Sequence, residues 1–528
     1  HMASVAARPQ TYPGRGGPVK LPSTARGVGG GGGDDHRGRL PERDAPTAVR
    51  ADGLPWWNSA PQVPPPASRR PRAGVQKRML PAYEMQDVVM EALEQFPVIV
   101  VVGATGCGKS TQLPIAYHRW SRSRGPAHAR GRVICCQPRR IAAVSLADRV
   151  SRECGRPLGS LVGYKVRFDT KASRETEVLY CTTGVLLRAM MRNTTLEGVS
   201  CVFLDEVHER DVLSDFTMML LRDIMQTSRP DLRLVLMSAT VDPTWCQQYF
   251  PSCHAVEIPG DQPYSVEWRW LEDCLEITGH TPKTPAPSAA SEISAAAPGQ
   301  ADLDVALAAL PAKHAGRAKA LKEVISAPCE WIDFDLILKI VEHIDLKEDP
   351  YLMDSLSPTS GPAVKGAILI FMPGMFEIRQ LIQKLRLLRN ARSWMLLPLH
   401  STLSQIEQQK VFERPPGQKR KIIVCTNIAE SSVTIDDVVY VIDSGRERLL
   451  GLDPETNVSS LRTQWIARSN ALQRKGRSGR CRAGVYYALF SSVQFEKVFV
   501  DTHSPEMQRT QVENLCLQVK AMGFGDIQ

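Results

Sequence analysis

Two adjacent carboxylates and a histidine stand directly after an apolar run. Residues 201–210 read CVFLDEVHER, so Asp205, Glu206 and His208 follow four residues suited to a buried strand. A charged, solvated turn after a strand is the ordinary interpretation. At the carboxyl end of a parallel strand, however, paired carboxylates can also hold a metal ion and activate a water molecule. The choice depends on what the rest of the chain supplies.

A glycine-rich loop supplies a matching phosphate site. Residues 103–111 read GATGCGKST, after the apolar run PVIVVV and before a helical pattern. Glycines in this spacing let backbone N–H groups and a helix N-terminus surround phosphates. Lys109 is predicted to reach the β- and γ-phosphates, and Ser110 to offer a hydroxyl to Mg²⁺. A plain glycine-rich turn is the alternative, which the strand–loop–helix context disfavours. The predicted cofactor-binding loop comprises Gly103, Ala104, Thr105, Gly106, Cys107, Gly108, Lys109, Ser110 and Thr111.

With a phosphate-binding loop predicted, the carboxylates at the end of the apolar run can be assigned catalytic roles. Asp205 is predicted to hold the metal through water, and Glu206 to act as the base that orients and activates the attacking water. The predicted metal set is Ser110, Asp205 and Glu206. His208 lies too far along the chain to be a ligand. We expect it to couple this site to the sequence SAT (Ser238, Ala239 and Thr240) at the end of the next strand.

A third motif repeats arginine every three residues. In QRKGRSGR, residues 473–480, this spacing predicts Arg474, Arg477 and Arg480 near one face of a helix. A basic surface helix is the alternative. Arginines on a second lobe that face a phosphate loop are what an arginine-finger mechanism requires, and Gln473 could help to hold the water. The predicted catalytic set is Lys109, Asp205, Glu206, His208, Gln473, Arg477 and Arg480.

Short apolar runs alternate with helical patterns in two series, which predicts an α/β fold with two doubly wound parallel sheets. The first lobe is predicted over residues 80–265 and the second over 333–502. A linker with an Ala/Pro/Ser-rich insertion is predicted over 266–332. Residues 1–79 are rich in Pro, Gly and Arg and are predicted to form a disordered basic arm.

The net charge of +9 resides mainly in that arm. Residues 1–80 contain 13 Lys/Arg and 5 Asp/Glu, or +8, which leaves +1 for the remainder. The arm is expected to add salt-sensitive, sequence-independent RNA affinity, or alternatively to serve as a targeting or protein-binding segment. The 13 cysteines form no CxxC pair, which argues against zinc ribbons and for free thiols in a reducing compartment. No apolar run reaches the roughly 18–20 residues that span a bilayer. The cytoplasm is the favoured location, with the mitochondrion and the nucleus as alternatives.

The ordered motifs resemble those of the DEAH/RHA group of superfamily 2 RNA helicases. They are GATGCGKST, QPRRIAAVSLADRV, CTTGVLLR, DEVHER, LVLMSAT, ILIFMPG, LPLHSTLS, TNIAESSVTIDD and QRKGRSGR, in that order along the chain. The resemblance implies two RecA-like lobes, with Mg²⁺ and ATP in the cleft between them. Other nucleoside triphosphates are expected to be accepted as well. Single-stranded RNA is expected across the top of the lobes, contacted mainly through phosphate and sugar.

The resemblance also assigns binding residues. It places adenine between Arg149 and Phe412, and adds Asp436 to the nucleotide site. Stacking without hydrogen bonds to the base edge implies weak selectivity among nucleotides. The implied RNA-binding residues are Gln137, Arg139, Arg140, Arg167, Phe168, Thr183, Gly184, His400, Ser401, Thr426 and Asn427.

The chain departs from the family pattern in three places. Val207 makes the acidic motif DEVH, and Lys475 and Ser478 replace residues that are often alanine; neither change removes a predicted catalytic group. Residues 503–528 resemble the start of a winged-helix domain, so the chain is expected to be the core of a longer, monomeric motor with ribonucleoprotein partners. Two alternatives stay open: an RNA-binding scaffold with a vestigial ATPase, and a DNA-directed motor of the same superfamily.

Overall fold

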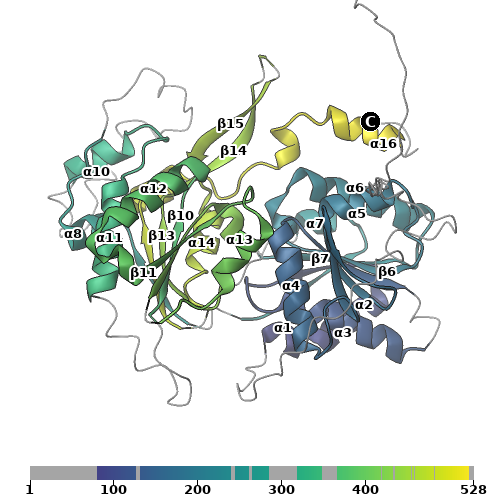
Figure 1. Cartoon of the computed structure of the whole chain (residues 1–528). Helices are drawn as coiled ribbons and strands as arrows, with labels where there is room; N and C mark the ends of the chain where they lie inside the picture. Colours follow the sequence, from purple (N-terminus) through teal and green to yellow (C-terminus); the bar gives the residue numbers. More distant parts are fainter. Residues whose placement is uncertain are drawn as a thin grey trace, which may run out of the picture. The chain divides into compact units, whose positions relative to one another are not determined.

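The computed structural model describes residues 80–125, 131–239, 244–260, 264–284, 318–347, 365–417, 419–431, 435–453, 455–456, 458–480 and 482–521. Within these ranges two parallel sheets are each flanked by helices, as the alternation of strands and helices predicted (Figure 1). The predicted arm, residues 1–79, lies entirely outside the described residues, as does the larger part of the Ala/Pro/Ser-rich insertion. No helix in the described ranges is long and apolar enough to cross a membrane.

The first sheet has the strand order β4-β3-β5-β2-β6-β7-β1-β8, and all neighbours are parallel except β4 and β3. Its strands are β1 (Val98–Val102), β2 (Arg132–Gln137), β3 (Val162–Val166), β4 (Asp169–Lys171), β5 (Val178–Thr182), β6 (Val199–Leu204), β7 (Arg233–Ser238) and β8 (Cys253–Glu257). The phosphate loop follows β1 and the acidic motif follows β6. Since β7 pairs with both β1 and β6, the sheet brings the two motifs to one edge.

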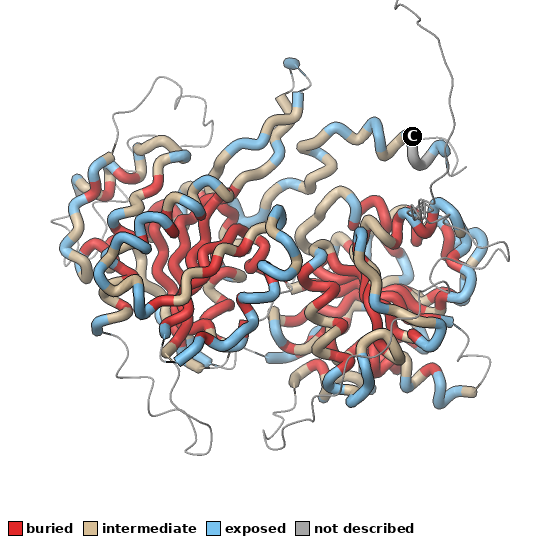
Figure 2. The backbone as a smooth tube through the Cα atoms, viewed as in Figure 1, coloured by how far each residue is buried: buried red, intermediate tan, exposed pale blue. Residues whose placement is uncertain are grey.

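Helices cover both faces of this sheet. One apolar core packs β-strand residues against α5, α6 and α7, and the other packs them against α1 to α4. These helices are α1 (Pro81–Glu84), α2 (Gln86–Gln95), α3 (Lys109–Ser123), α4 (Arg140–Glu153), α5 (Thr183–Met190), α6 (Val212–Thr227) and α7 (Thr244–Tyr249). The inner strands β1, β2, β5, β6 and β7 are buried nearly throughout, which explains their mainly apolar sequences, whereas β4 and β8 at the two edges of the sheet are partly exposed (Figure 2).

The second sheet is parallel, with the order β11-β12-β10-β13-β16-β9. Its strands are β9 (Val266–Arg269), β10 (Ala367–Phe371), β11 (Trp394–Leu399), β12 (Arg420–Cys425), β13 (Val438–Asp443) and β16 (Gly484–Ala488). A separate antiparallel hairpin, β14 (Arg446–Asp453) with β15 (Val458–Trp465), begins just after β13. The accompanying helices are α8 (Leu271–Thr278), α10 (Ala318–Ile325), α11 (Phe334–Lys347), α12 (Met375–Leu387), α13 (Gln405–Gln409), α14 (Arg468–Lys475) and α15 (Ser492–Lys497).

The edge strand β9 corrects the predicted linker. Residues 266–332 were predicted to connect the lobes, but β9 pairs with β16 and therefore belongs to the second sheet. The strand has only four residues, too few for an apolar run to stand out. Aromatic packing holds it in place, since Trp268 lies edge-on to Tyr486 and Phe495 at centroid distances of 4.9 and 5.3 Å. Helix α8 packs on the same lobe through Leu271 and Leu275.

A segment that follows the second lobe returns to the first. This C-terminal strap, residues 503–515, contacts the hairpin through His503 Nε2, which lies 2.7 Å from Glu447 Oε1. Further along, Glu506 Oε2 accepts a hydrogen bond from the backbone N–H of Val212 (3.0 Å), and the N–H of Glu506 donates to the carbonyl of Arg210 (3.1 Å). The strap contains the short helical turn Glu506–Gln508 and leads into α16 (Glu513–Ala521). It therefore connects the base of the hairpin to the start of α6.

Candidate functional site

The phosphate loop is held open by its glycines. Gly106 and Gly108 have φ of +91° and +101°, values that favour glycine. The backbone N–H of Ala82 donates to the carbonyl of Cys107 (3.0 Å), which braces the loop from behind. Lys109, the first residue of α3, is buried, and its Nζ donates to the carbonyls of Gly103 and Ala104, the latter at 3.3 Å. The loop is therefore a cradle that encloses the ammonium group of Lys109.

Asp205 lies beside this cradle. Its Oδ2 accepts hydrogen bonds from Ser110 Oγ (2.5 Å) and Gln137 Nε2 (2.7 Å). Burial, and secondarily the charge of Glu206, raises the pKa of Asp205 to about 6. A buried carboxylate paired with a hydroxyl offers the oxygen ligands that Mg²⁺ prefers. The described residues contain no group of three or more His, Cys, Asp or Glu able to hold a metal ion.

Glu206 and His208 form the next part of the site. Glu206 is buried and has φ of +57°, unusual outside glycine, so the chain turns sharply at this carboxylate. His208 Nδ1 lies 3.6 Å from Glu206 Oε2 and accepts a hydrogen bond from the N–H of Ala239 (3.2 Å). His208 therefore joins the acidic motif to the end of β7, where Ser238 is buried. Thr240 lies outside the described residues.

The predicted helical face of three arginines is wrong. Helix α14 ends at Lys475, and Arg477 and Arg480 lie in the turns that follow Gly476. Arg474 points into the second lobe, where it is 1% exposed, and so does not share a surface with the other two. The motif therefore divides into one arginine at the end of α14 that is anchored in the second lobe and two arginines carried by turns.

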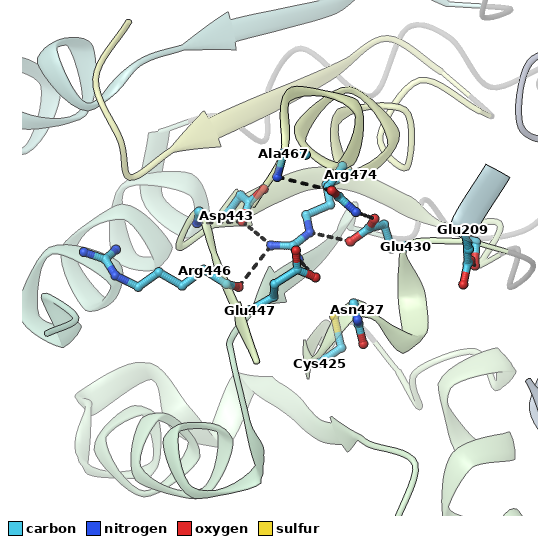
Figure 3. Close-up of polar contacts among 12 residues, drawn as sticks. Glu209, Cys425, Asn427, Glu430, Asp443, Arg446, Glu447, Ala467 and Arg474 are labelled. Carbon is cyan, nitrogen blue, oxygen red and sulfur yellow. Dashed lines mark hydrogen bonds and ion pairs between the residues drawn. The ribbon is translucent and has the colours of Figure 1, made fainter. Parts of the chain in front are cut away.

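Arg474 is held by three carboxylates (Figure 3). Its Nε donates to Glu430 Oε2 and its Nη1 to Asp443 Oδ1, both at 2.8 Å, while Glu447 Oε2 lies 4.0 Å from Nη2. The guanidinium also lies over the ring of Phe371, at 4.9 Å from its centroid. This network ties α14, the end of β13 and the loop after β12 together, and so fixes the start of the turn that carries Arg477 and Arg480.

We expect Arg474→Met to destabilise the protein rather than to impair catalysis selectively. Three buried carboxylates would lose their shared cation, and breaking a buried ion pair costs about 3–5 kcal/mol. Chemical denaturation would measure the change. Arg462→Ala, on the exposed hairpin, is the matched control and should change the free energy of unfolding by no more than about 0.5 kcal/mol. Wild-type stability in Arg474→Met would contradict the anchoring role.

The other two arginines reach the first lobe. A Cβ placed on Gly106 would lie 3.7 Å from Arg480 Nε, so that guanidinium rests against the phosphate loop. Arg477 is 3% exposed. Burial lowers its pKa, as does the nearby charge of Arg480, whereas the carboxylate of Glu206 acts in the opposite direction. The cradle, the acidic motif and both arginines therefore meet in one site. Gln473 is half-buried in the last turn of α14.

Two residues predicted to contact RNA make contacts within the protein. The side chain of Gln137 is fully buried and donates to Asp205, because it points into the sheet end rather than to the surface. Arg139 donates to the carbonyl of Asn427 and pairs with Glu209 at 3.2 Å. Ser431 Oγ also donates to Glu209. Arg139 and Glu209 of the first lobe thus make polar contacts with Asn427 and Ser431 of the second lobe, which the motif pattern alone did not reveal.

The remaining predicted RNA residues occupy strand ends and loops. Phe168 is 90% exposed with the guanidinium of Arg167 over its ring, at 4.8 Å from the centroid. Thr183 is buried, and its Oγ1 donates to the Gln137 carbonyl at 3.4 Å. The other positions are exposed or half-buried except Thr426, which is nearly buried: Arg140, Gly184, His400, Ser401, Thr426 and Asn427. The second-lobe members follow β11 and β12, at one edge of the sheet.

The residues assigned to the adenine and nucleotide site come from different elements: Arg149 from α4, Phe412 from the short helical turn Lys410–Phe412 and Asp436 from the turn before β13. Arg149 pairs with Glu153 of its own helix at 3.1 Å. Phe412 is 37% exposed, and Asp436 is exposed in the turn before β13.

Sequence reasoning missed two functional residues, Glu430 and Asp443, which hold Arg474. Asp443 is the last residue of an apolar strand, and Asp205 directly follows one. This shared sequence pattern could have identified Asp443 as a candidate site residue.

Comparisons with known proteins agree with this architecture. The model of the DEAD/DEAH box helicase family matches residues 76–248, and that of the helicase conserved C-terminal domain matches residues 354–482. The chain is 37% identical over 475 residues to the Arabidopsis thaliana DExH-box ATP-dependent RNA helicase DExH1, covering 85% of this chain and 44% of that protein. It is 38% identical over 471 residues to the human ATP-dependent RNA helicase DHX30, covering 88% of this chain and 33% of that protein.

A solved structure shares the fold. The crystal structure of the Escherichia coli DEAH/RHA helicase HrpB superposes with a TM-score of 0.62 at 28% sequence identity, covering 85% of this chain and 47% of that one. The chain spans less than half the length of each of these relatives. The chain therefore corresponds to a part of each of these proteins.

Proposed function

Because the chain belongs to the DEAH/RHA family of ATP-dependent RNA helicases, we propose that it hydrolyses ATP in response to single-stranded RNA and uses the cycle to move along and remodel RNA or ribonucleoproteins. The observation that carries this proposal is the meeting of the lobes at the nucleotide site. Arg480 lies against Gly106, and Arg477 is close enough to Glu206 for their charges to interact. Neither lobe alone contains the complete site.

Each group has a task in this proposal. Lys109 and the loop N–H groups bind the phosphates, and Ser110 and Asp205 would hold Mg²⁺, which when bound offsets negative charge on the phosphates. Glu206 orients the attacking water and accepts its proton. Arg477 and Arg480 stabilise the charge that develops on the transferred phosphoryl group. The Arg139–Asn427 and Ser431–Glu209 contacts support closure, since they join the lobes beside the acidic motif.

RNA is proposed to lie along the carboxyl edges of both sheets. Phe168 in the first lobe offers an exposed ring for stacking on a base. His400 and Thr426 follow neighbouring strands of the second lobe. Contacts to phosphate and sugar suit a motor that must pass over any sequence. RNA that spans both lobes would favour the closed arrangement, and so would couple RNA binding to turnover.

Steady-state ATPase rates with and without RNA test the proposal. We expect single-stranded RNA to increase turnover, with a smaller effect from DNA of the same length. Lys109→Ala should weaken nucleotide binding and remove turnover under both conditions, which excludes a contaminating ATPase. No turnover in the wild-type chain, combined with RNA binding, would instead indicate a scaffold. Equal stimulation by DNA would indicate a motor that does not distinguish the two nucleic acids.

A further inference from the structure

Lys421, near the amino end of β12, is a buried cation that lies outside all of the sequence motifs. It is the second residue of β12, whose neighbours in the sheet are β11 and β10. Side chains two residues apart in a strand share a face, so Lys421 lies on the side that carries Ile423 and Cys425. Both of these residues belong to an apolar core, and the side chain of Lys421 is only 2% exposed. A lysine is almost never buried in this way unless its charge is paired.

Three oxygen atoms surround the ammonium group of Lys421. Its Nζ donates to the carbonyls of Val411 and Glu413, at 2.8 and 2.9 Å, and lies 2.8 Å from Asp437 Oδ2. An ammonium group has three N–H donors, so these contacts use all of them. Any effect of Lys421 on a ligand must therefore act through the segments that it holds.

The two carbonyls belong to the residues before and after Phe412, to which the resemblance assigns one side of adenine. Val411 is fully buried in the second-lobe core, whereas the ring of Phe412 is partly exposed. The helical turn Lys410–Phe412 has only three residues, so its own hydrogen bonds contribute little to its rigidity. The ammonium group of Lys421 therefore fixes the backbone on both sides of the Phe412 ring.

The third contact reaches the other second-lobe segment assigned to the nucleotide. Asp437 directly follows Asp436, which the resemblance adds to the nucleotide site, and precedes β13. The carbonyl of Asp437 accepts a hydrogen bond from the N–H of Ala367 at 2.8 Å, which ties this turn to β10. Lys421 thus holds the turns that carry Phe412 and Asp436 in place relative to each other.

We propose that Lys421 is a positioning residue for nucleotide binding, because its ammonium group holds the Phe412 ring ready to stack on the base and keeps Asp436 beside it. The inference rests on the proposed function, since it concerns the same nucleotide site. A ring that is already fixed loses less conformational entropy when a base stacks on it. Every base has a face that can stack, so Lys421 contributes to the affinity for all nucleoside triphosphates and not to a preference among bases.

Two ligands separate the base end of the site from its phosphate end. ATP occupies both ends, whereas inorganic tripolyphosphate has no base. Lys421→Met removes the ammonium group and keeps an unbranched side chain. It should raise the KM for ATP about tenfold, as expected for the loss of one base–aromatic contact. The inhibition constant of tripolyphosphate and the kcat at saturating ATP and RNA should stay at wild-type values.

A matched control and a conservative variant accompany this measurement. Lys419→Met removes an exposed lysine two residues earlier and should behave as wild type. Asp437→Asn keeps the shape of the carboxylate partner and removes its charge. It should raise the KM for ATP less than Lys421→Met does, without changing the inhibition by tripolyphosphate. If thermal unfolding shows that Lys421→Met does not fold, Asp437→Asn decides the matter, and a wild-type KM in it would overturn the inference.

A double-mutant cycle identifies the route of the effect. Phe412→Ala should raise the KM for ATP as Lys421→Met does, and combining the two changes should add little, because a ring that is absent cannot be positioned. Full additivity would overturn the inference, as would an unchanged KM in either single variant. Equal losses of affinity for ATP and tripolyphosphate in Lys421→Met would indicate a general disturbance of the site and would also overturn it. Absence of ATP turnover in the wild-type chain would overturn the proposed function itself.

Discussion

Glu206→Gln is expected to abolish ATP turnover while nucleotide binding stays close to wild type. The amide has nearly the same shape as the carboxylate but cannot accept a proton from water. Loss of a positioned general base lowers rates on the order of 10² to 10⁴-fold. The neighbouring contacts should survive, because Asp205 keeps its hydrogen bonds from Ser110 and Gln137.

Two measurements separate binding from chemistry in this variant. A fluorescent ATP analogue reports nucleotide affinity, and steady-state phosphate release reports turnover. Glu91→Gln, an exposed carboxylate on α2, is the control for the same chemical change away from the site. Near wild-type turnover in Glu206→Gln would exclude Glu206 as the base. Loss of nucleotide affinity would instead assign it to phosphate or metal binding.

Arg477→Ala and Arg480→Ala are each expected to reduce turnover by about 10³-fold or more, the usual contribution of an arginine finger. The reason is geometric, since Arg480 rests on the phosphate loop and Arg477 is buried near Glu206. Both variants should bind RNA with nearly wild-type affinity, because the two guanidinium groups face the nucleotide site. Lys497→Ala, an exposed cation on α15, controls for the loss of one positive charge from the second lobe.

The alternative interpretation, a basic surface helix, predicts the opposite effects on RNA binding and turnover. If the arginines formed a basic surface, their loss would weaken RNA binding and leave turnover normal at saturating RNA. Assaying the double variant Arg477→Ala, Arg480→Ala at saturating RNA distinguishes the two cases. RNA-stimulated turnover at the wild-type rate in that variant would remove lobe closure from the mechanism.

Strand ends were the most predictable part of the site. An apolar run followed at once by polar residues marks where a buried parallel strand leaves the sheet, and this signal located both the phosphate loop and Asp205. This signal does not indicate in which direction a side chain at the strand end points. Gln137 was therefore assigned to the RNA path, whereas its amide turns inward to Asp205.

The arginine motif shows a second limit of sequence reasoning. A spacing of three residues fits one face of a helix only while the helix continues, and α14 ends before Gly476. Carboxylates distant in sequence, Glu430 and Asp443, determine that Arg474 is an anchor. Such long-range pairing cannot be read from local spacing. The four-residue strand β9 was missed because its place depends on β16, more than two hundred residues later.

The C-terminal strap limits how the two lobes can separate. The chain passes from the first lobe to the second between β8 and β9, and returns when Glu506 binds the backbone of Arg210 and Val212. The lobes are therefore joined by the chain between β8 and β9 and by the Glu506 contact, in addition to the polar contacts beside the acidic motif. If those polar contacts open, the two remaining connections restrict the lobes to a rotation about the line between them. One of these two connections is attached to residues directly after the acidic motif. An opening stroke during the ATPase cycle must therefore either pivot about the Glu506 contact or break it.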